Sequence, residues 1–220
     1  MTKKRLAAKS WRITCDQNTF KKCLKDGKFP YIVTLARAVN ALNSASALLA
    51  PSPKIDTPAS VRNRINSYLF SAALLYEAIQ LTKKMNKVFL RDTVFQSGIK
   101  NLLKDPIAQA IERLHLKPSR HAAVFHFDPE TFAQTITKKR DEECVFISAR
   151  GRKNKNLHFA FADVLAVEIH VGLSSEHGDF YAKFEKTVGE MTDLIIRFST
   201  EANSLIVHYL KEWGFERADI

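Results

Sequence analysis

The sequence predicts a mostly α-helical protein, an up-and-down bundle that carries one small β-hairpin insertion near residues 144–161. Long stretches of the chain repeat apolar residues every three or four positions, which is the spacing of one helix face. Several helix starts are marked by a capping residue that is followed by proline. Near residue 150, two short apolar segments flank a polar turn, as the strands of a hairpin do.

The 220 residues, 45% of them apolar, are enough for one domain with a sizeable core. Residues 1–28 are basic, with only scattered apolar positions. We therefore expect an N-terminal arm there, either loose or containing a short helix, and a single helical domain over residues 29–220. Apolar residues at helical spacing predict the first helix of this domain over residues 31–49, and Pro51 ends it.

A long central helix is expected next. Thr57 and Pro58 supply a cap and a first helical residue, and the apolar pattern continues to about residue 86. Such a helix is roughly 45 Å long at 1.5 Å per residue. Its apolar stripe is wide, so we expect it to have two buried sides.

Shorter elements follow the central helix. Residues 88–104 predict one helix, and Asp105-Pro106 begins another, which Pro118 interrupts. Asp128-Pro129 marks a further helix start. The basic end of that helix, which suits the helix dipole, consists of Lys138, Lys139 and Arg140.

The C-terminal part begins with the expected hairpin. Residues 144–149 and 157–161 predict two short strands joined by a polar turn. Residues 180–210 then repeat apolar residues at helical spacing and predict a long helix, which Gly214 ends.

The net charge of +11 favours a polyanionic partner, and RNA is the one we expect. The alternative is a basic surface that only keeps the protein soluble. No apolar run approaches the length of a membrane span, so we expect no membrane partner. The basic start of the chain also lacks the apolar stretch of a signal peptide. Three cysteines without a C-x-x-C pair indicate free thiols and a cytoplasmic protein.

Neither a metal ion nor a cofactor is expected. The chain has no glycine-rich phosphate loop. His170, Glu176 and His177 are close together in the sequence but lack a recognised metal-binding spacing, so we interpret them as loop and helix-end residues.

Arg120 and His126 are the candidate catalytic residues, and they flank a short apolar segment. An arginine keeps its charge near neutral pH, whereas a histidine can exchange a proton there. Such a pair can hold a phosphodiester and move its proton, which favours cleavage of RNA without a metal ion. Arg152 and His158 have the same spacing, but they lie around a polar turn that is typical of a solvated loop.

Six residues of regular helix rotate a side chain by about 600°, or 240° net, so two side chains at this spacing do not share a face. Arg120 and His126 therefore converge only if the helix is irregular, or if a dimer axis brings two copies together. Otherwise they are a histidine at a helix end and an arginine in a surface pair. Glu77 stands on the mostly apolar central helix. If it is buried it needs a partner, for which Arg120 and His126 are the candidates; the alternative is a solvent-facing glutamate.

The segment from Leu116 to Asp128 resembles the signature of the HEPN superfamily of α-helical proteins. In that signature an arginine is followed by a polar residue, a short apolar segment and a histidine. Arg120, His121 and His126 occupy these positions here. The long central helix is also similar to the first core helix of such proteins.

The resemblance implies a dimeric helical bundle, often a metal-independent ribonuclease of toxin–antitoxin, phage-defence or RNA-processing systems. It implies that Arg120 and His126 are catalytic, that His121 supports them and that Glu77 orients one of them. The expected RNA contacts are Lys117, Lys138, Lys139 and Arg140. Asp128 stands where members that are silenced by nucleotide transfer carry a tyrosine, so we do not expect that control. The hairpin is not part of a minimal bundle of this kind.

Two functions follow from these features. The first is a metal-independent endoribonuclease that cleaves RNA through its 2′-hydroxyl, acts as a homodimer and has an antitoxin or another partner protein. The second is a non-catalytic helical module that binds RNA or a protein, in which Arg120 and His126 are structural.

Overall fold

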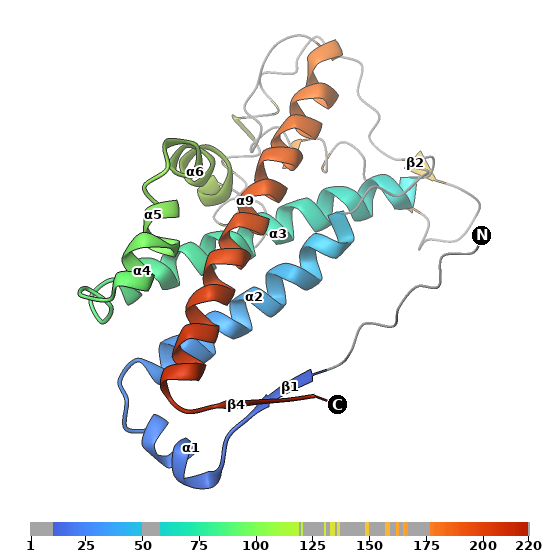
Figure 1. The fold of residues 1–220 in the computed structure, drawn as a ribbon. Coiled ribbons are helices and arrows are strands. Elements are labelled where there is room, and N and C mark those ends of the chain that lie inside the picture. Colours follow the sequence, from blue (N-terminus) through green and yellow to red (C-terminus); the bar gives the residue numbers. More distant parts are fainter. Residues whose placement is uncertain are drawn as a thin grey trace, which may run out of the picture.

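A computed structural model describes residues 11–49, 58–118, 120, 130, 133–134, 136, 148–149, 157–158, 162, 165–166 and 177–219. These residues are mostly helical, which confirms the predicted fold class at that level (Figure 1). The predicted helix after Pro129 and most of the predicted hairpin lie outside the described residues.

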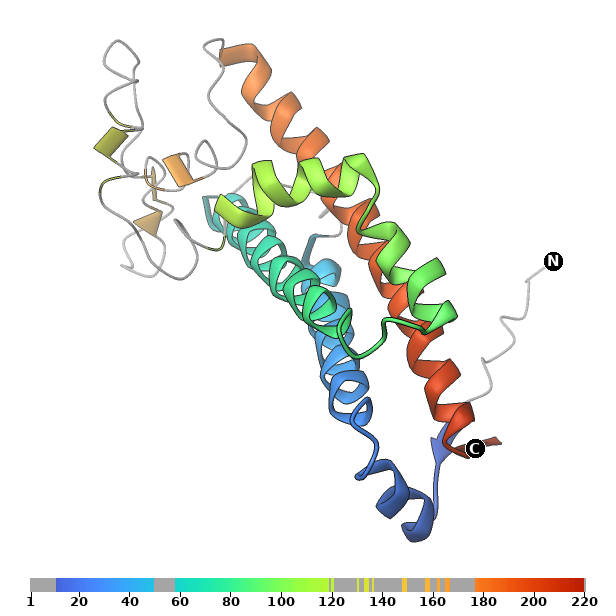
Figure 2. The ribbon, with the colours of Figure 1, turned by 90° about the vertical axis from the view of Figure 1, so that its left-hand side faces the viewer.

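Three long helices form the body of the protein: α2 (Phe29–Leu49), α3 (Pro58–Met85) and α9 (His177–Glu212). α2 and α3 lie side by side in both views, and α9 crosses them (Figures 1 and 2). The sequence predicted each of these helices, because each has a long apolar repeat. α3 begins at Pro58 and ends one residue before the predicted end.

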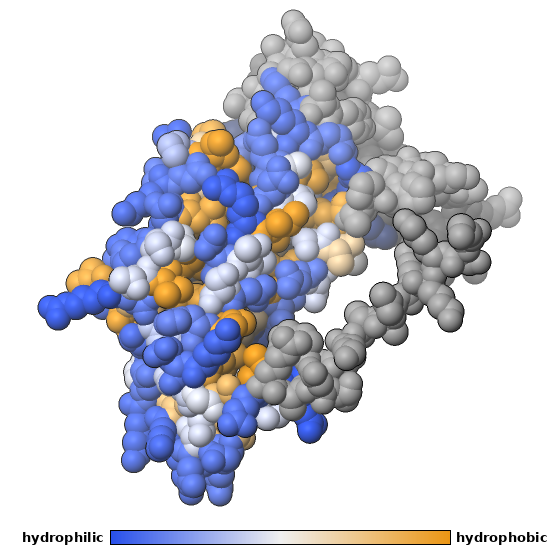
Figure 3. All heavy atoms as spheres, viewed as in Figure 1, coloured by the Kyte–Doolittle hydropathy of each residue, from blue (hydrophilic) through white to orange (hydrophobic). Residues whose placement is uncertain are grey.

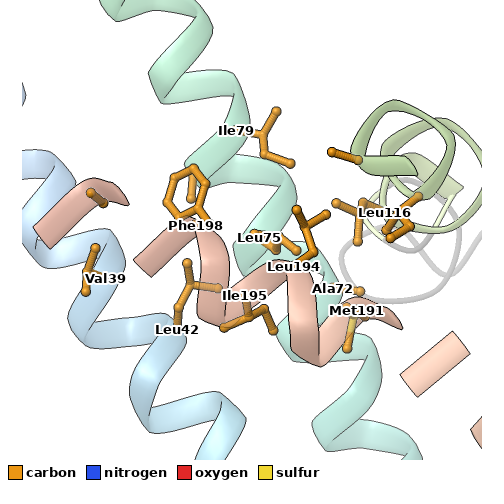
Figure 4. Close-up of a cluster of buried hydrophobic side chains, with 14 of the residues drawn as sticks. Val39, Leu42, Ala72, Leu75, Ile79, Leu116, Met191, Leu194, Ile195 and Phe198 are labelled. Carbon is orange, nitrogen blue, oxygen red and sulfur yellow. The ribbon is translucent and has the colours of Figure 1, made fainter. Parts of the chain in front are cut away.

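The core lies where the three helices meet (Figure 4). Val39 and Leu42 come from α2, and Leu75 and Ile79 come from α3. The residues that α9 adds are Met191, Leu194, Ile195 and Phe198. α3 contacts α2 and also the segment that contains Leu116, so its wide apolar stripe has partners on two sides, as expected.

The prediction of one helix over residues 88–104 is wrong. Two short helices, α4 (Thr93–Ser97) and α5 (Ile99–Leu102), stand there instead. The carboxylate of Asp92 accepts a hydrogen bond from the Phe95 N–H at 2.7 Å and so caps a new helix start. Gly98 then has a non-helical backbone, which separates α4 from α5. Apolar periodicity alone reveals neither the new start at Asp92 nor the break at Gly98.

Asp105 caps α6 (Pro106–Ile111), as predicted, by accepting a hydrogen bond from the Ile107 N–H at 2.8 Å. Pro118, however, does not end the helix. α6 continues into a π-helical turn, η1 (Glu112–Leu116), and residues 117–118 remain helical. The Lys117 N–H bonds to the Glu112 carbonyl, five residues back. A proline ring clashes with the carbonyl four residues before it in an α-helix, and the wider π turn changes that geometry directly before Pro118.

The two ends of the chain pair with each other. β1 (Trp11–Thr14) is antiparallel to β4 (Glu216–Asp219), with Trp11 opposite Asp219. Between β1 and α2 lies α1 (Gln17–Cys23). Residues 11–28 of the expected N-terminal arm therefore contain the short helix that was one of the two alternatives, together with a strand that was not expected.

The predicted stop at Gly214 is confirmed. Gly214 has φ 81°, in the left-handed region, and its N–H bonds to the Lys211 carbonyl at 2.9 Å. The Phe215 N–H bonds to the Leu210 carbonyl, also at 2.9 Å. These two bonds form a Schellman motif, which satisfies the last carbonyls of α9 and turns the chain toward β4.

Within the predicted hairpin, β2 (Ser148–Ala149) pairs antiparallel with β3 (Leu157–His158). Ser148 stands opposite His158 and Ala149 opposite Leu157. This short ladder is the described part of the expected 144–161 insertion.

Candidate functional site

Arg120 and Glu77, two of the predicted site residues, are in contact. Nε of Arg120 donates a hydrogen bond to Oε1 of Glu77 at 2.8 Å. The side chain of Arg120 is 31% exposed and that of Glu77 is 52% exposed. The guanidinium is thus held by a carboxylate and remains partly open to solvent.

The pair lies next to a set of contacts between η1 and α3. Oε1 of Glu112 accepts a hydrogen bond from Nε2 of Gln80 at 2.9 Å and also pairs with Lys83. Between Glu112 and Arg120, the fully buried Leu116 anchors η1 in the core. Contacts on both sides of a buried anchor fix the path of the chain on which Arg120 stands.

Glu77 agrees in part with each of the two interpretations of its role. Its side chain is exposed, as the solvent-facing alternative held, and it also contacts Arg120, one of the two partners considered. An exposed carboxylate does not need a partner to be stable. The contact therefore orients Arg120 more than it stabilises the fold.

The other predicted site residues are distributed as follows. Lys117 is exposed, one residue after η1. Outside the described residues lie His121, His126, Lys138, Lys139 and Arg140. Arg120 itself is π-helical. Residues 121–126, where an irregular backbone would let Arg120 and His126 converge, lie outside the described residues.

A second polar cluster, which the sequence analysis missed, joins Lys28, Asp92 and Tyr209. Nζ of Lys28 donates to the Tyr209 hydroxyl at 2.6 Å and lies 3.7 Å from Oδ2 of Asp92. The Tyr209 hydroxyl donates in turn to Oδ2 of Asp92. The Asp92 side chain is only 8% exposed. Three segments far apart in the sequence meet here: the turn before α2, the turn before α4 and the end of α9.

Aromatic rings surround this cluster. The Lys28 ammonium lies 5.5 Å from the centre of the Phe89 ring and 4.9 Å from that of Tyr209. Nε1 of Trp213 donates to Oδ2 of Asp26 at 2.9 Å, and the Trp213 ring packs against Tyr209.

The electrostatics of the cluster suit a structural role. Burial alone would raise the pKa of Asp92, but the hydrogen bonds from Tyr209 and Phe95 and the charge of Lys28 lower it overall. Burial, together with the bond to Asp92, raises the pKa of Tyr209. Near neutral pH the carboxylate stays ionised and the phenol stays neutral, so neither group is suited to exchange a proton. Asp92 is a typical N-cap residue and marks the start of α4. It was missed because residues 88–104 were interpreted as one helix.

Within the described part of the chain, no group of three histidine, cysteine, aspartate or glutamate side chains is placed to hold a metal ion. Cys15 and Cys23 are free thiols there. None of the helices in that part is both long and apolar enough to cross a membrane.

Comparison of the chain with protein-family models, with curated proteins and with solved structures finds no match.

Proposed function

We propose that this protein is a metal-independent endoribonuclease of the HEPN type. The observation that carries the proposal is the hydrogen bond between Arg120 and Glu77, which holds a partly exposed guanidinium on a π-helical residue. A cation held in a fixed position can stabilise the charge that develops on a phosphate during cleavage. The helical bundle and the contacts of η1 with α3 are compatible with this architecture.

In the proposed reaction, Arg120 binds the scissile phosphate. His126 acts as general base and removes the proton of the ribose 2′-hydroxyl, whose oxygen attacks phosphorus. The bond from phosphorus to the 5′-oxygen breaks, and that oxygen takes up a proton from a general acid. The products are a 2′,3′-cyclic phosphate and a 5′-hydroxyl. His121 supports this pair and Glu77 positions Arg120.

The proposal includes the setting of the reaction. Lys117, Lys138, Lys139 and Arg140 contact the RNA backbone, in keeping with the net charge of +11. The active form is a homodimer in the cytoplasm, where a twofold axis doubles the arginines and histidines of one cleft. The expected biological setting is toxin–antitoxin or phage defence, with an antitoxin or another protein as partner.

One observation favours a second candidate function. Arg120 already has a surface carboxylate as its partner, and this contact ties the chain after η1 to α3. That arrangement also fits a non-catalytic module that binds RNA or a protein, in which Arg120 is structural.

The test is incubation of the full chain with labelled single-stranded and structured RNAs in excess EDTA. We expect cleavage by the wild type, and a loss of at least about 100-fold in Arg120→Ala and His126→Ala. Arg113→Ala serves as the matched control, because Arg113 is an exposed arginine of η1, the π-helical turn that precedes Arg120. Undiminished cleavage in both variants would contradict the proposal. No cleavage by the wild type, with lower stability or loss of the dimer in the variants, would favour the second candidate.

A further inference from the structure

The connection between α3 and α4 carries two exposed apolar side chains at its end. We name residues 84–91 the basic tip. Leu90 is 62% exposed and Val88 is also exposed. Figure 1 shows this connection projecting past α4, and Figure 3 shows hydrophobic atoms next to hydrophilic ones at the same edge of the molecule. A leucine this exposed at a projecting position is available for contact with another surface.

Positive charge surrounds these apolar side chains. Between residues 83 and 104 the chain has six basic residues and a single acidic residue, Asp92. Asp92 is turned inward, where it bonds to Tyr209 and to the Phe95 N–H. Lys83 pairs with Glu112. Of the other five, Lys84, Lys87 and Arg91 belong to the basic tip; all three are exposed and form no ion pair with a described residue.

The basic tip is held firmly by its own buried residue. Phe89, between the exposed Val88 and Leu90, is fully buried and packs against the rings of Tyr31, Phe95 and Tyr209. The N–H groups of Val88 and Phe89 both bond to the Met85 carbonyl at 2.9 Å. The exposure of Leu90 is therefore a fixed feature of the fold, and no rearrangement is needed to present it.

We propose that the basic tip docks on the surface of an anionic phospholipid bilayer. Leu90 and Val88 enter the boundary between headgroups and acyl chains, while Lys84, Lys87 and Arg91 contact the lipid phosphates and carboxylates. Surface attachment of this kind combines a small buried apolar area with attraction to anionic lipid. Such attachment needs no membrane-spanning helix. The expectation of no membrane partner rested only on the lack of an apolar run long enough to span a membrane.

The same charges could also contact RNA, but the apolar side chains favour lipid. Sequence-tolerant binding of single strands uses exposed aromatic rings on which bases stack. The one aromatic residue of the basic tip, Phe89, is buried, and a leucine offers neither a ring nor a hydrogen bond. The proposal is independent of the ribonuclease activity proposed above.

The experiment is flotation of the full chain with vesicles of phosphatidylcholine alone and with vesicles that contain about 30% phosphatidylserine, at about 0.1 M salt. We expect binding only to the anionic vesicles. The double variant Lys87→Ala/Arg91→Ala is expected to lower the partition coefficient about 20- to 30-fold, since each basic residue contributes about fivefold. Leu90→Ser is expected to lower it about 5- to 10-fold.

Ile107→Ser is the matched control, because Ile107 is 60% exposed but lies on α6, away from the basic tip. It should bind the vesicles like the wild type. Equal binding to both kinds of vesicle, or no binding at all, would overturn the proposal. A third contrary result would be Leu90→Ser with unchanged vesicle binding while Lys87→Ala/Arg91→Ala loses affinity for a single-stranded RNA, because the basic tip would then be an RNA-binding surface.

Discussion

Nε of Arg120 lies 2.8 Å from Oε1 of Glu77, which is 43 residues earlier in the chain and stands on the central helix. Both side chains are partly exposed, and ion pairs of this kind contribute only about 0–1 kcal/mol to stability. A change at Glu77 should therefore leave the fold nearly intact. The pair can be broken in order to measure what it does for function.

The first prediction concerns Glu77 as a positioning residue. If Arg120 contacts the scissile phosphate, Glu77→Ala should lower RNA cleavage about 10- to 100-fold through misplacement of the guanidinium. Glu77→Gln, which keeps an oxygen that can accept the hydrogen bond, should lower it less. The free energy of unfolding should change by less than about 1 kcal/mol in both variants.

Glu185→Ala provides the control for this prediction. Glu185 is 53% exposed and pairs with Arg64, in a contact that does not involve Arg120. It should match the wild type in cleavage. A Glu77→Ala variant that cleaves RNA at the wild-type rate would remove Glu77 from the site.

The second prediction concerns the polar cluster of Lys28, Asp92 and Tyr209. Tyr209→Phe removes the hydroxyl that donates to Asp92 and accepts from Lys28. The buried carboxylate then keeps fewer partners, so we expect the free energy of unfolding to fall by about 1 to 2 kcal/mol in denaturant titrations. Tyr31→Phe is the comparison, because Tyr31 packs against Phe89 without a hydrogen bond to any described residue. Equal effects of the two changes would show that the loss does not come from the contacts of the Tyr209 hydroxyl with Asp92 and Lys28.

The long helices could be predicted from the sequence because their signals are local and repeated. In the sequence, a capping type of residue followed by proline marks the starts of α3 and α6, and α9 has a long apolar stripe and a glycine stop. The break at Gly98 was missed, since apolar residues on both sides of it continue the helical spacing. The π turn before Pro118 was missed because a proline in a helical pattern ordinarily indicates an end.

The contacts between residues far apart in the sequence limit how much of the site could be predicted. The sequence could name Arg120 as one of two partners for Glu77, because an arginine and a carboxylate attract each other, but no local pattern chooses between the two. The contacts among Lys28, Asp92 and Tyr209 bridge up to 181 residues. The pairing of β1 with β4 joins the two ends of the chain in the same way. Neither is visible in a local repeat.

The third prediction concerns acid stability. The pKa of Asp92 is lower in the folded protein than its ordinary value. Between the folded pKa and the ordinary pKa of aspartate, the unfolded state therefore binds more protons than the folded state. The stability that Asp92 contributes is present above about pH 4 and is lost as the pH falls toward the folded pKa. We expect Asp92→Asn to be less stable than the wild type at neutral pH, and this difference should shrink below about pH 4. Unfolding titrations at several pH values measure it, and a difference that is constant with pH would contradict the assigned cause.

The fourth prediction compares two glycines that are expected to respond with opposite signs. Gly214 has φ 81°, a conformation that costs an L-residue with a side chain about 1 to 2 kcal/mol, and it closes the Schellman motif at the end of α9. Gly189 stands within α9, is exposed, and a methyl group there would meet no atom within 4 Å. Gly214→Ala should therefore lower the free energy of unfolding by about 1 to 2 kcal/mol. Gly189→Ala should raise it by about 0.5 to 1 kcal/mol, because alanine loses less backbone entropy in a helix.

The open space around both glycines makes this comparison informative. A methyl group at Gly214 would also meet no atom within 4 Å, so a loss of stability there comes from the backbone conformation and not from a clash. Because β4 follows Gly214 directly and pairs with β1, the Gly214→Ala change should also reduce hydrogen-exchange protection of residues 11–14. A stabilising effect at Gly214, or protection of β1 that does not change, would show that α9 ends independently of the pairing between the two chain ends.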